Sequence, residues 1–368
     1  MTLGELMTVK TTHKKDEKSD QPIRLFHLSH NDLDGYSCQM ITKRFFPKTH
    51  FFNSGYGQEV SAKLNAIGDQ LRWHTNFNAN EQRILLISDI NITKDECKLA
   101  ESIAQESDTT LYLLDHHKSG EAQAREFKWY FLDNERCATK ITYDWCKERF
   151  PQSAAAKDSI VAEYVECVNV YDLWKSEDKQ RFEFGKVLNR LVMEAREIGQ
   201  FMFGDRDNEY RLSLLEDALK FLDNYRNIEL DDHLLSIKKH YLSEGKASDT
   251  IDNLTAKYVV TLLIKNRDRF TIHYGEYKGL LTYQIGNSSI LGNEFLQSCP
   301  DYHFFMDVNK NGNTSLRANN ALDVSAMASK LFGGGGHANA SGGRIIGFRD
   351  VYTYEQLRDR IRPILEAV

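Results

Sequence analysis

Four short polar clusters stand out in this sequence because each follows directly on an apolar run. They combine carboxylates with imidazoles, the side chains that most often bind divalent cations or exchange protons. A single aspartate after a strand is more often a helix cap or a turn residue, so the recurrence of the pattern is the informative feature. The clusters are HLSHNDLDG with His30, Asp32 and Asp34, ISDIN with Asp89, LDHH with Asp115, His116 and His117, and VNVYDLW with Asp172.

Gathered in one place, these clusters would hold five carboxylates and three imidazoles. So many acids without counter-charges would raise one another's pKa values and destabilise the fold, unless cations lay between them. A metal cluster resolves this conflict. Mixed carboxylate and imidazole ligands favour Mn²⁺, with Zn²⁺, Fe²⁺, Co²⁺ and Mg²⁺ as alternatives. None of the four clusters contains a cysteine that would favour a soft metal.

The runs that precede the clusters have the pattern of short strands separated by helices. Residues 23–29, 83–90 and 110–115 are apolar runs of strand length, and residues 95–107 have the spacing of an amphipathic helix. This alternation predicts a mostly parallel sheet with helices on its faces. Ligands bind at the carboxyl ends of the strands in such sheets, which is where the clusters occur.

Downstream the pattern becomes helical and then returns to strands. Residues 136–248 are largely helical by their apolar spacing, and strand-like runs follow at 256–264, 269–275, 279–285 and 302–308. We therefore expect an α/β protein with an N-terminal mostly parallel sheet flanked by helices, a helical connection, and a smaller C-terminal α/β domain. The expected parts are a flexible tail over 1–22, a first domain with the helical connection over 23–248, and a second domain over 249–368.

Length, charge and cysteine content narrow the class of protein. A chain of 368 residues exceeds the usual size of one hydrophobic core, so two domains are expected. No apolar run approaches the roughly 20 residues of a membrane span, and a signal peptide is not recognised, so a cytoplasmic protein is the simplest interpretation. The net charge of -6 argues against a protein that coats long nucleic acid, but it is compatible with a small anionic substrate. The six cysteines contain no CxxC pair, so neither a zinc ribbon nor a disulfide framework is indicated.

A glycine-rich stretch, LFGGGGHANASGG, lies near the C-terminus and allows two interpretations. Four consecutive glycines fit a flexible loop, because they are costly to order. Alternatively, backbone amides without a neighbouring Cβ can approach a phosphate closely, and His337 follows them directly. Arg317 and Arg344 flank the stretch with guanidinium groups that suit a phosphate.

Taken together, these motifs resemble the DHH phosphoesterase superfamily. The matching elements are, in order, HNDLDG, the aspartate of ISDI, the DHH trio, the aspartate of VYDLW and GGGGHANASGG. The resemblance covers most of residues 23–348 and is to the subgroup with a C-terminal DHH-associated domain. Within it, the chain is most similar to the NrnA and NrnB type of oligoribonucleases, or nanoRNases, and the SHNDLDGYSC form of the first motif favours the NrnB type.

The resemblance implies a site for two divalent metal ions, with Mn²⁺ the first expectation. One ion would be held by His30, Asp32 and Asp89, and the other by Asp34, Asp89, His116 and Asp172. Asp115 would orient a neighbouring histidine and His117 would face the phosphate, which makes these two the catalytic candidates. The implied substrate-binding residues are Arg317, Gly334, Gly335, Gly336, His337 and Arg344. Relatives commonly carry serine after the Ser-Leu-Arg segment, where this chain has Ala318 and Asn319, so the details of recognition there stay open.

Paired metal ions lower the pKa of a water molecule and orient a phosphodiester for in-line attack. The resemblance therefore implies a phosphodiesterase that hydrolyses very short oligonucleotides or linear dinucleotides to mononucleotides. A RecJ-like single-strand exonuclease, a 3'-phosphoadenosine-5'-phosphate phosphatase and a cyclic dinucleotide phosphodiesterase are enzymatic alternatives, and a nucleotide-sensing binding protein is the non-enzymatic one. The expected partner is short RNA or a dinucleotide, with no track for long nucleic acid and no membrane, and a homodimer is compatible with the resemblance.

Overall fold

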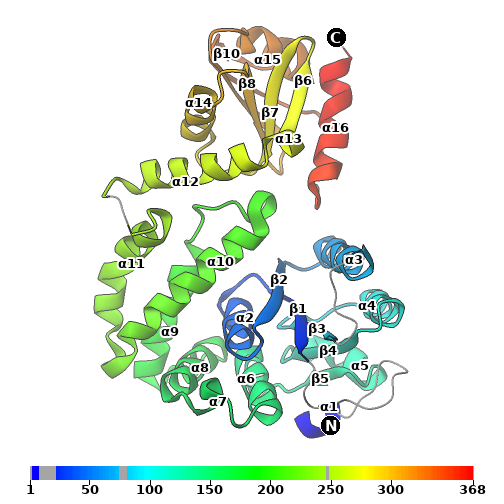
Figure 1. The fold of residues 1–368 in the computed structure, drawn as a ribbon, viewed down its shortest axis with the longest axis vertical. Coiled ribbons are helices and arrows are strands. Elements are labelled where there is room, and N and C mark those ends of the chain that lie inside the picture. Colours follow the sequence, from blue (N-terminus) through cyan, green and yellow to red (C-terminus); the bar gives the residue numbers. More distant parts are fainter. Residues whose placement is uncertain (1, 8–21, 74–80, 246–247, 368) are drawn as a thin grey trace. The chain divides into compact units, whose positions relative to one another are not determined.

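The computed structural model describes residues 2–7, 22–73, 81–245 and 248–367. These residues fall into two compact units, which Figure 1 draws as ribbons coloured along the sequence. The first unit comprises Met1–Ala195 and Asn208–Leu234, and the second comprises Arg196–Asp207 and Leu235–Val368. Each unit has its own sheet.

The first unit is built on a five-stranded parallel sheet, as the sequence predicted. The three strands expected from apolar runs are the central ones, because a strand buried on both faces has a nearly continuous apolar sequence. The two edge strands were not predicted, since one is half-exposed and the other is only three residues long. In spatial order the strands are β2 (Lys48–Ser54), β1 (Ile23–His30), β3 (Gln82–Ser88), β4 (Thr110–Asp115) and β5 (Tyr130–Leu132).

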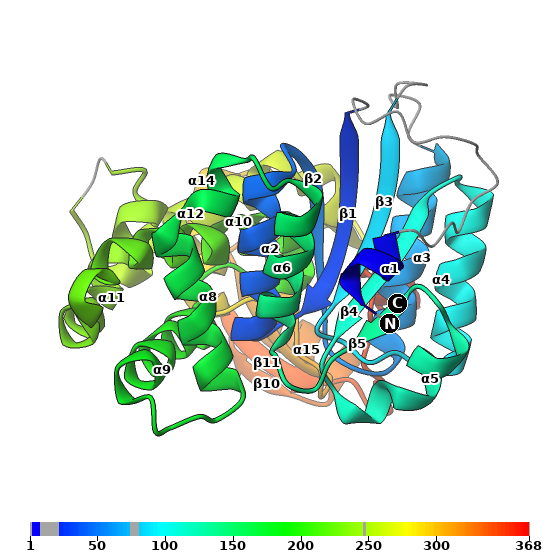
Figure 2. The same cartoon turned by 90° about the horizontal axis from the view of Figure 1, so that it is seen from below.

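Helices cover both faces of this sheet (Figure 2). The helices α2 (Leu33–Phe45) and α6 (Ala138–Arg149) pack on one face, and α3 (Gln58–Trp73) and α4 (Lys94–Glu106) pack on the other. The turn η1 (Lys118–Gly120) and the helix α5 (Glu121–Glu126) connect β4 to β5. The core beneath α3 and α4 is apolar and buried, and it includes Leu28, Leu64, Ile87, Ile103 and Leu113.

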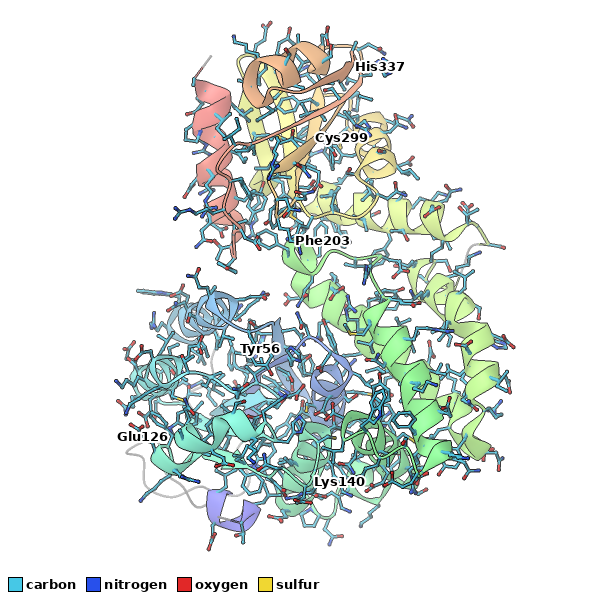
Figure 3. All side chains as sticks on the ribbon, turned by 180° about the vertical axis from the view of Figure 1, so that it is seen from behind. Tyr56, Glu126, Lys140, Phe203, Cys299 and His337 are labelled. Carbon is cyan, nitrogen blue, oxygen red and sulfur yellow. The ribbon has the colours of Figure 1, made fainter. Side chains whose placement is uncertain are left out.

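A helical region follows, which confirms the prediction for residues 136–248. The backbone of α10 is non-helical at Phe203 (φ -137°, ψ 48°), so the helix bends there (Figure 3). Two short 3-10 turns, Leu219–Phe221 and Asp223–Tyr225, separate α10 from α11. The helices are α7 (Ala154–Lys157), α8 (Ser159–Asp172), α9 (Lys179–Met193), α10 (Gln200–Ala218) and α11 (Asn227–Leu242).

The second unit contains a mixed sheet of six strands in the order β10-β11-β9-β8-β7-β6. The β7 and β8 strands pair in parallel, and the other neighbouring pairs are antiparallel. The strands are β6 (Thr271–Tyr274), β7 (Tyr277–Tyr283), β8 (Phe304–Val308), β9 (Asn313–Ala318), β10 (Gly335–His337) and β11 (Ala340–Arg344). The accompanying helices are α12 (Ile251–Lys265), α13 (Arg267–Phe270), α14 (Ser288–Ser298), α15 (Val324–Phe332) and α16 (Tyr354–Glu366). The predicted α/β class with a second sheet is therefore confirmed.

One predicted strand is wrong. Residues 256–264 belong to α12, whose N-cap Thr250 accepts a hydrogen bond from the amide of Asn253. The run was misassigned because Val259 and Val260 are β-branched and favour strands. A helix buried along much of its surface has an apolar sequence that cannot be told from a buried strand by periodicity alone.

The glycine-rich stretch forms regular structure, so its interpretation as a flexible loop is wrong. Gly333 ends α15 with a left-handed φ of 57°, and the next residues form β10. A Cβ on Gly334 would lie 2.0 Å from the carbonyl oxygen of Gly342, and one on Gly336 would lie 2.6 Å from that of Ala340. These glycines therefore permit the close approach between the β10 segment and β11, a structural role that is independent of any part in substrate binding.

The expected N-terminal tail covers residues 1–22, of which 8–21 lie outside the described ranges. Residues Leu3–Met7 form the helix α1, which packs on α6 with Leu6 fully buried. A five-residue helix leaves no periodic signal in the sequence. Among the helices in the described ranges, none has the length and apolar composition of a membrane span.

Candidate metal centre

The polar clusters of the first unit meet at the carboxyl ends of three neighbouring strands. His30 is the last residue of β1, Asp89 directly follows β3, and His116 directly follows β4. The chain places β2 on one side of β1 and β3 on the other, so the strand order reverses between β1 and β3. Open α/β sheets bind ligands at such a reversal, outside the carboxyl ends of the strands. The topology therefore brings together residues that are far apart in the sequence.

The start of α2 adds two more carboxylates. Asp32 caps the helix by accepting a hydrogen bond from the amide of Gly35 at 3.0 Å. Asp34 lies in the first turn, where its two oxygens accept hydrogen bonds from the amides of Ala138 and Thr139, each at 2.8 Å. Those amides belong to the start of α6, so a second helix fixes the direction of the Asp34 side chain.

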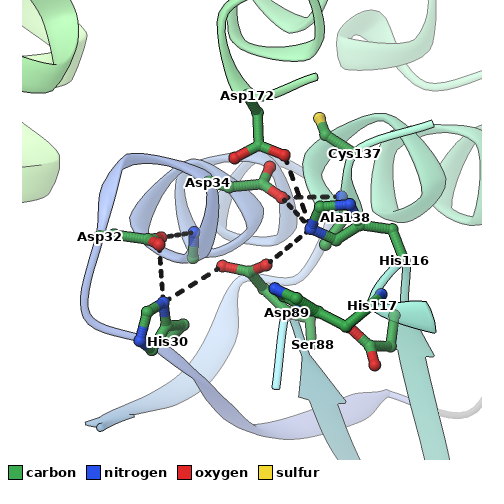
Figure 4. Close-up of polar contacts among 12 residues, drawn as sticks. His30, Asp32, Asp34, Ser88, Asp89, His116, His117, Cys137, Ala138 and Asp172 are labelled. Carbon is green, nitrogen blue, oxygen red and sulfur yellow. Dashed lines mark hydrogen bonds and ion pairs between the residues drawn. The ribbon is translucent and has the colours of Figure 1, made fainter. Parts of the chain in front are cut away.

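His30, Asp32 and Asp89 form a first ligand group. The Nδ1 atom of His30 lies 2.7 Å from Asp32 Oδ2 and 3.8 Å from Asp89 Oδ2 (Figure 4). Burial opposes ionisation of Asp32, but the hydrogen bond and charge of His30, together with the hydrogen bond from the amide of Gly35, outweigh it and lower the pKa of Asp32 to about 2. One ligand atom from each residue lies within 4.8 Å of the other two, a spacing that a single cation can bridge.

Asp34, His116 and Asp172 form a second ligand group, with Asp172 reaching it from the end of α8. The Nε2 atom of His116 lies 3.7 Å from Asp34 Oδ2 and 3.5 Å from Asp172 Oδ2. The same nitrogen lies 3.3 Å from Asp89 Oδ1, which links the two groups (Figure 4). Burial lowers the pKa of His116 and favours the neutral imidazole, the form that binds metals.

Asp89 lies between the two groups, with one oxygen toward His30 and the other toward His116. Its backbone is left-handed, with φ at 59°, a conformation that aspartate tolerates better than most residues. Its amide donates to the carbonyl oxygen of Leu114 at 3.1 Å, which fixes the backbone at the strand end. A strained, hydrogen-bonded turn thus aims the carboxylate at both histidines.

Two oxygens of these groups are buried without a hydrogen-bond partner among the described residues, Asp89 Oδ2 and Asp172 Oδ2. Burial and the neighbouring carboxylates raise the pKa of Asp89 well above its usual range and raise that of Asp172 to about 9. Divalent cations would satisfy the unpartnered oxygens and offset the repulsion. The donor set therefore fits hard or borderline divalent cations.

Asp115 orients His117 rather than His116. Its Oδ1 accepts a hydrogen bond from His117 Nδ1 at 2.7 Å, and its Oδ2 accepts one from the Tyr130 hydroxyl at 2.6 Å. Burial disfavours the charged form of His117, but the hydrogen bond to Asp115 and the negative charges of Asp115, Asp34 and Asp32 together outweigh it and raise the pKa of His117. Gly120 packs against this network, where a Cβ would lie 2.1 Å from the Tyr130 hydroxyl. The three adjacent residues therefore have three different environments.

Tyr56 also belongs to this site, and the sequence did not identify it. It lies between β2 and α3, with its ring centroid 5.1 Å from that of His30 and its hydroxyl 3.5 Å from His117 Nε2. Because β2 was not predicted, nothing placed the GYG segment at the same sheet edge as the acidic clusters. The amides of Ala138 and Thr139 were missed as well, since backbone donors leave no mark on residue type.

The remaining candidate residues belong to the second unit and lie on or beside the three neighbouring strands β10, β11 and β9. Arg317 lies on β9, where it donates to the carbonyl oxygen of the preceding residue at 2.7 Å and to the Ser289 hydroxyl. His337 (Figure 3) and Arg344 are exposed on β10 and β11. Gly334, Gly335 and Gly336 are exposed beside them.

Proteins similar to this chain are known by sequence and by structure, although no protein-family model matches it. The chain is 38% identical over 353 residues to the 3',5'-cyclic-nucleotide phosphodiesterase of Helicobacter pylori, a match that covers 93% of this chain and 99% of that protein. It is 25% identical over 357 residues to the oligoribonuclease NrnB of Bacillus subtilis, covering 92% of this chain and 78% of that protein. The crystal structure of an uncharacterized Helicobacter pylori protein matches with a TM-score of 0.87 and 37% identity, covering 94% of this chain and 100% of that one.

Proposed function

This chain belongs to the DHH phosphoesterase superfamily, and we propose that it is a divalent-cation-dependent phosphodiesterase that acts on small nucleotides. The two relatives are named for cyclic nucleotides and for oligoribonucleotides, and both kinds of molecule contain a 3',5'-phosphodiester. One observation carries the proposal: the buried Asp89 carboxylate lies between two groups of metal-ligand type and has an oxygen without a hydrogen-bond partner among the described residues.

The proposed ligands follow the two groups. His30, Asp32 and Asp89 would hold one cation, and Asp34, His116 and Asp172 would hold the other with Asp89 shared. Mn²⁺ is the proposed metal, because it accepts both carboxylate and imidazole ligands. The amides of α6 that bind Asp34 keep its carboxylate directed at the site before any cation arrives.

When bound, the cations would lower the pKa of the attacking water and offset charge on the phosphoryl oxygens. Residues of the chain would supply the hydrogen bonds and the proton that the reaction also needs. Asp115 holds the Nδ1–H of His117, which leaves Nε2 directed away from Asp115. Because Asp115 favours the charged ring, Nε2–H of His117 can donate to a phosphate oxygen and protonate the departing alkoxide.

We assign substrate capture to residues of the second unit. Arg317, His337 and Arg344 supply cationic or hydrogen-bonding groups, and Gly335 and Gly336 are exposed beside them, whereas the amide of Gly334 donates to the carbonyl oxygen of Ala328 at 3.1 Å. In this proposal residues 23–248 carry the catalytic site and residues 249–368 bind the distal part of the substrate. The net charge of -6 favours small substrates over long strands, which would be repelled outside the local site.

A 3',5'-cyclic nucleotide is the first substrate to test. The phosphodiesterase named for cyclic nucleotides is 38% identical to this chain, and the match covers 99% of that protein. The oligoribonuclease is 25% identical, and the match covers 78% of it. Linear dinucleotides and very short oligoribonucleotides are the second candidate, because the second relative is named an oligoribonuclease and these molecules contain the same type of phosphodiester bond.

The test is an assay of protein stripped of metal and reloaded with Mn²⁺. Substrates are 3',5'-cyclic mononucleotides, linear and cyclic dinucleotides, labelled oligoribonucleotides of about two to ten residues, 3'-phosphoadenosine 5'-phosphate and long single-stranded DNA. We expect turnover of the cyclic mononucleotides or the shortest linear substrates, falling steeply with length. Processive degradation of the long DNA would instead support a RecJ-like exonuclease, and nucleotide binding without any product would support a sensor.

A further inference from the structure

Tyr56 contacts both ends of the candidate site. Its ring lies against the ring of His30 with 5.1 Å between centroids, and it meets the ring of His117 edge-on at 6.3 Å. Its side chain is 49% exposed, in contrast to the buried aspartates Asp34 and Asp89 behind it. Tyr56 follows the carboxyl end of β2, and Figure 3 labels it in the first unit. Tyr56 therefore forms part of the accessible wall of the site.

The Tyr56 hydroxyl faces the ring nitrogen of His117 that Asp115 does not hold. The Nδ1 atom of His117 is bonded to Asp115, so Nε2 is the nitrogen left to face a substrate, and the Tyr56 hydroxyl lies 3.5 Å from it. A phenol can accept a hydrogen bond from Nε2–H and still donate its own proton. The site thus offers two donors side by side, one on the His117 ring that Asp115 holds and one on the phenol of Tyr56.

The loop that carries Tyr56 is held by its own hydrogen bonds. The amide of Gly55 donates to Glu59 Oε2 at 3.0 Å, and the Ser54 hydroxyl donates to the carbonyl oxygen of Gly55 at 2.7 Å. Gly57 supplies the left-handed turn into α3, with φ at 83°. Packing alone accounts for the ring against His30, but it does not account for a half-exposed hydroxyl directed at His117.

We propose that the Tyr56 hydroxyl donates a hydrogen bond to a non-bridging phosphate oxygen of the substrate, beside His117. This inference rests on the proposed function, because it requires a phosphate at the candidate metal centre. The chemical class of ligand is a phosphate monoester or diester, and inorganic phosphate is the simplest probe of the contact.

The test compares Tyr56→Phe with the wild-type protein, both stripped of metal for the Mn²⁺ titration and loaded with Mn²⁺ for the other measurements. The substitution keeps the ring against His30 and removes only the hydroxyl. Titration calorimetry gives the affinities for Mn²⁺ and for inorganic phosphate, and steady-state assays give kcat and KM. We expect unchanged Mn²⁺ affinity, a phosphate affinity about 10- to 100-fold lower, and a kcat lower by a similar factor, as for loss of a hydrogen bond to a charged group.

Tyr225→Phe is the matched control. The Tyr225 hydroxyl donates to Glu163 at 2.6 Å, and Glu163 lies in the first half of α8, whereas Asp172 ends that helix. This variant loses a comparable hydroxyl in the same unit and should match the wild type in all three measurements.

Two outcomes would overturn the assignment. If Tyr56→Phe binds phosphate as the wild type does, the hydroxyl does not contact the phosphate. If it loses Mn²⁺ affinity, Tyr56 acts through the metal ligands instead. Failure of the proposed function gives a different result: weaker phosphate binding in Tyr56→Phe, with no nucleotide hydrolysed by the wild type, would refute the phosphodiesterase and leave the tyrosine contact standing.

Discussion

The buried Asp115 carboxylate accepts a hydrogen bond from His117 Nδ1 at 2.7 Å, and His117 directly follows the candidate metal ligand His116. Its other oxygen accepts the hydroxyl of Tyr130 at 2.6 Å. Both oxygens thereby have hydrogen-bond partners, and the side chain of the site that Asp115 holds by a hydrogen bond is His117. This arrangement predicts how the pH dependence of the reaction changes when the carboxylate is neutralised.

Asp115→Asn should shift the high-pH limb of the kcat profile to lower pH. Burial lowers the pKa of His117, whereas the Asp115 carboxylate raises it. Removing the charge of Asp115 therefore lowers the pKa of His117, because the effect of burial remains. A smaller fraction of His117 is then charged at neutral pH, and we expect kcat to fall roughly 100-fold at about pH 8. Kinetics across the range from about pH 5 to pH 9 measure the shift.

Tyr130→Phe serves as the control for that variant. It removes the hydrogen bond to the other oxygen of Asp115 and keeps the one to His117, so its profile should move much less. Identical profiles for Asp115→Asn and the wild type would show that His117 does not need to be charged.

Asp89→Asn should impair both cation sites at once. The amide has nearly the same shape as the carboxylate, but it loses the charge that faces His30 and His116. We expect weaker binding of both Mn²⁺ ions by calorimetry and a kcat about 1000-fold lower, which corresponds to several kcal/mol of lost stabilisation. Asp95→Asn on α4, where the side chain is 96% exposed, should change neither quantity. Full activity in Asp89→Asn would refute the shared ligand.

Metal-free protein should lose stability as the pH rises. The pKa of Asp172 is about 9 in the folded chain against the usual 3.8, so the folded form holds this proton more tightly than the unfolded chain does. Its contribution to stability is therefore complete below about pH 4 and is lost as the pH rises toward about 9. Thermal unfolding in chelator at several pH values measures this loss.

Mn²⁺ should reverse the loss, because it neutralises the ionised carboxylates. At one hundred times its Kd, a ligand that binds only the folded form adds about 2.7 kcal/mol to the free energy of unfolding. Metal-free Asp172→Asn should have a flatter pH dependence than the wild type. Stability that rises between about pH 5 and pH 9 without metal would contradict the assignment of repelling acids.

His337→Ala should raise KM and leave Mn²⁺ binding unchanged, because His337 lies on β10 of the second unit and the proposed metal ligands lie in the first. Loss of one charged or polar phosphate contact predicts a KM roughly 10-fold higher. His273→Ala is the matched control, since it removes an exposed histidine from β6, at the opposite edge of the same sheet. Loss of bound metal in His337→Ala would show that the substrate-binding assignment is wrong.

Much of the first unit could be predicted because its strands leave a local signal. The central strands β1, β3 and β4 are buried on both faces, which makes them apolar along their length and makes the polar residues after them conspicuous. An apolar sequence does not distinguish a buried helix from a buried strand, and residues 256–264 were misassigned for that reason. The half-exposed β2 has a weaker pattern, and Tyr56 was overlooked with it.

By itself, the sequence determined that carboxylates and imidazoles recur after buried strands, and with that the expectation of a cation site at one sheet edge. Only the tertiary structure decided that Asp115 bonds to His117 and not to His116, that amides of α6 hold Asp34, and that Tyr56 lies beside His117. The physical reason is the separation along the sequence between the residues that make each contact. Residue type and periodicity record burial within one element, whereas these contacts depend on the strand order and on how segments distant in the sequence pack together.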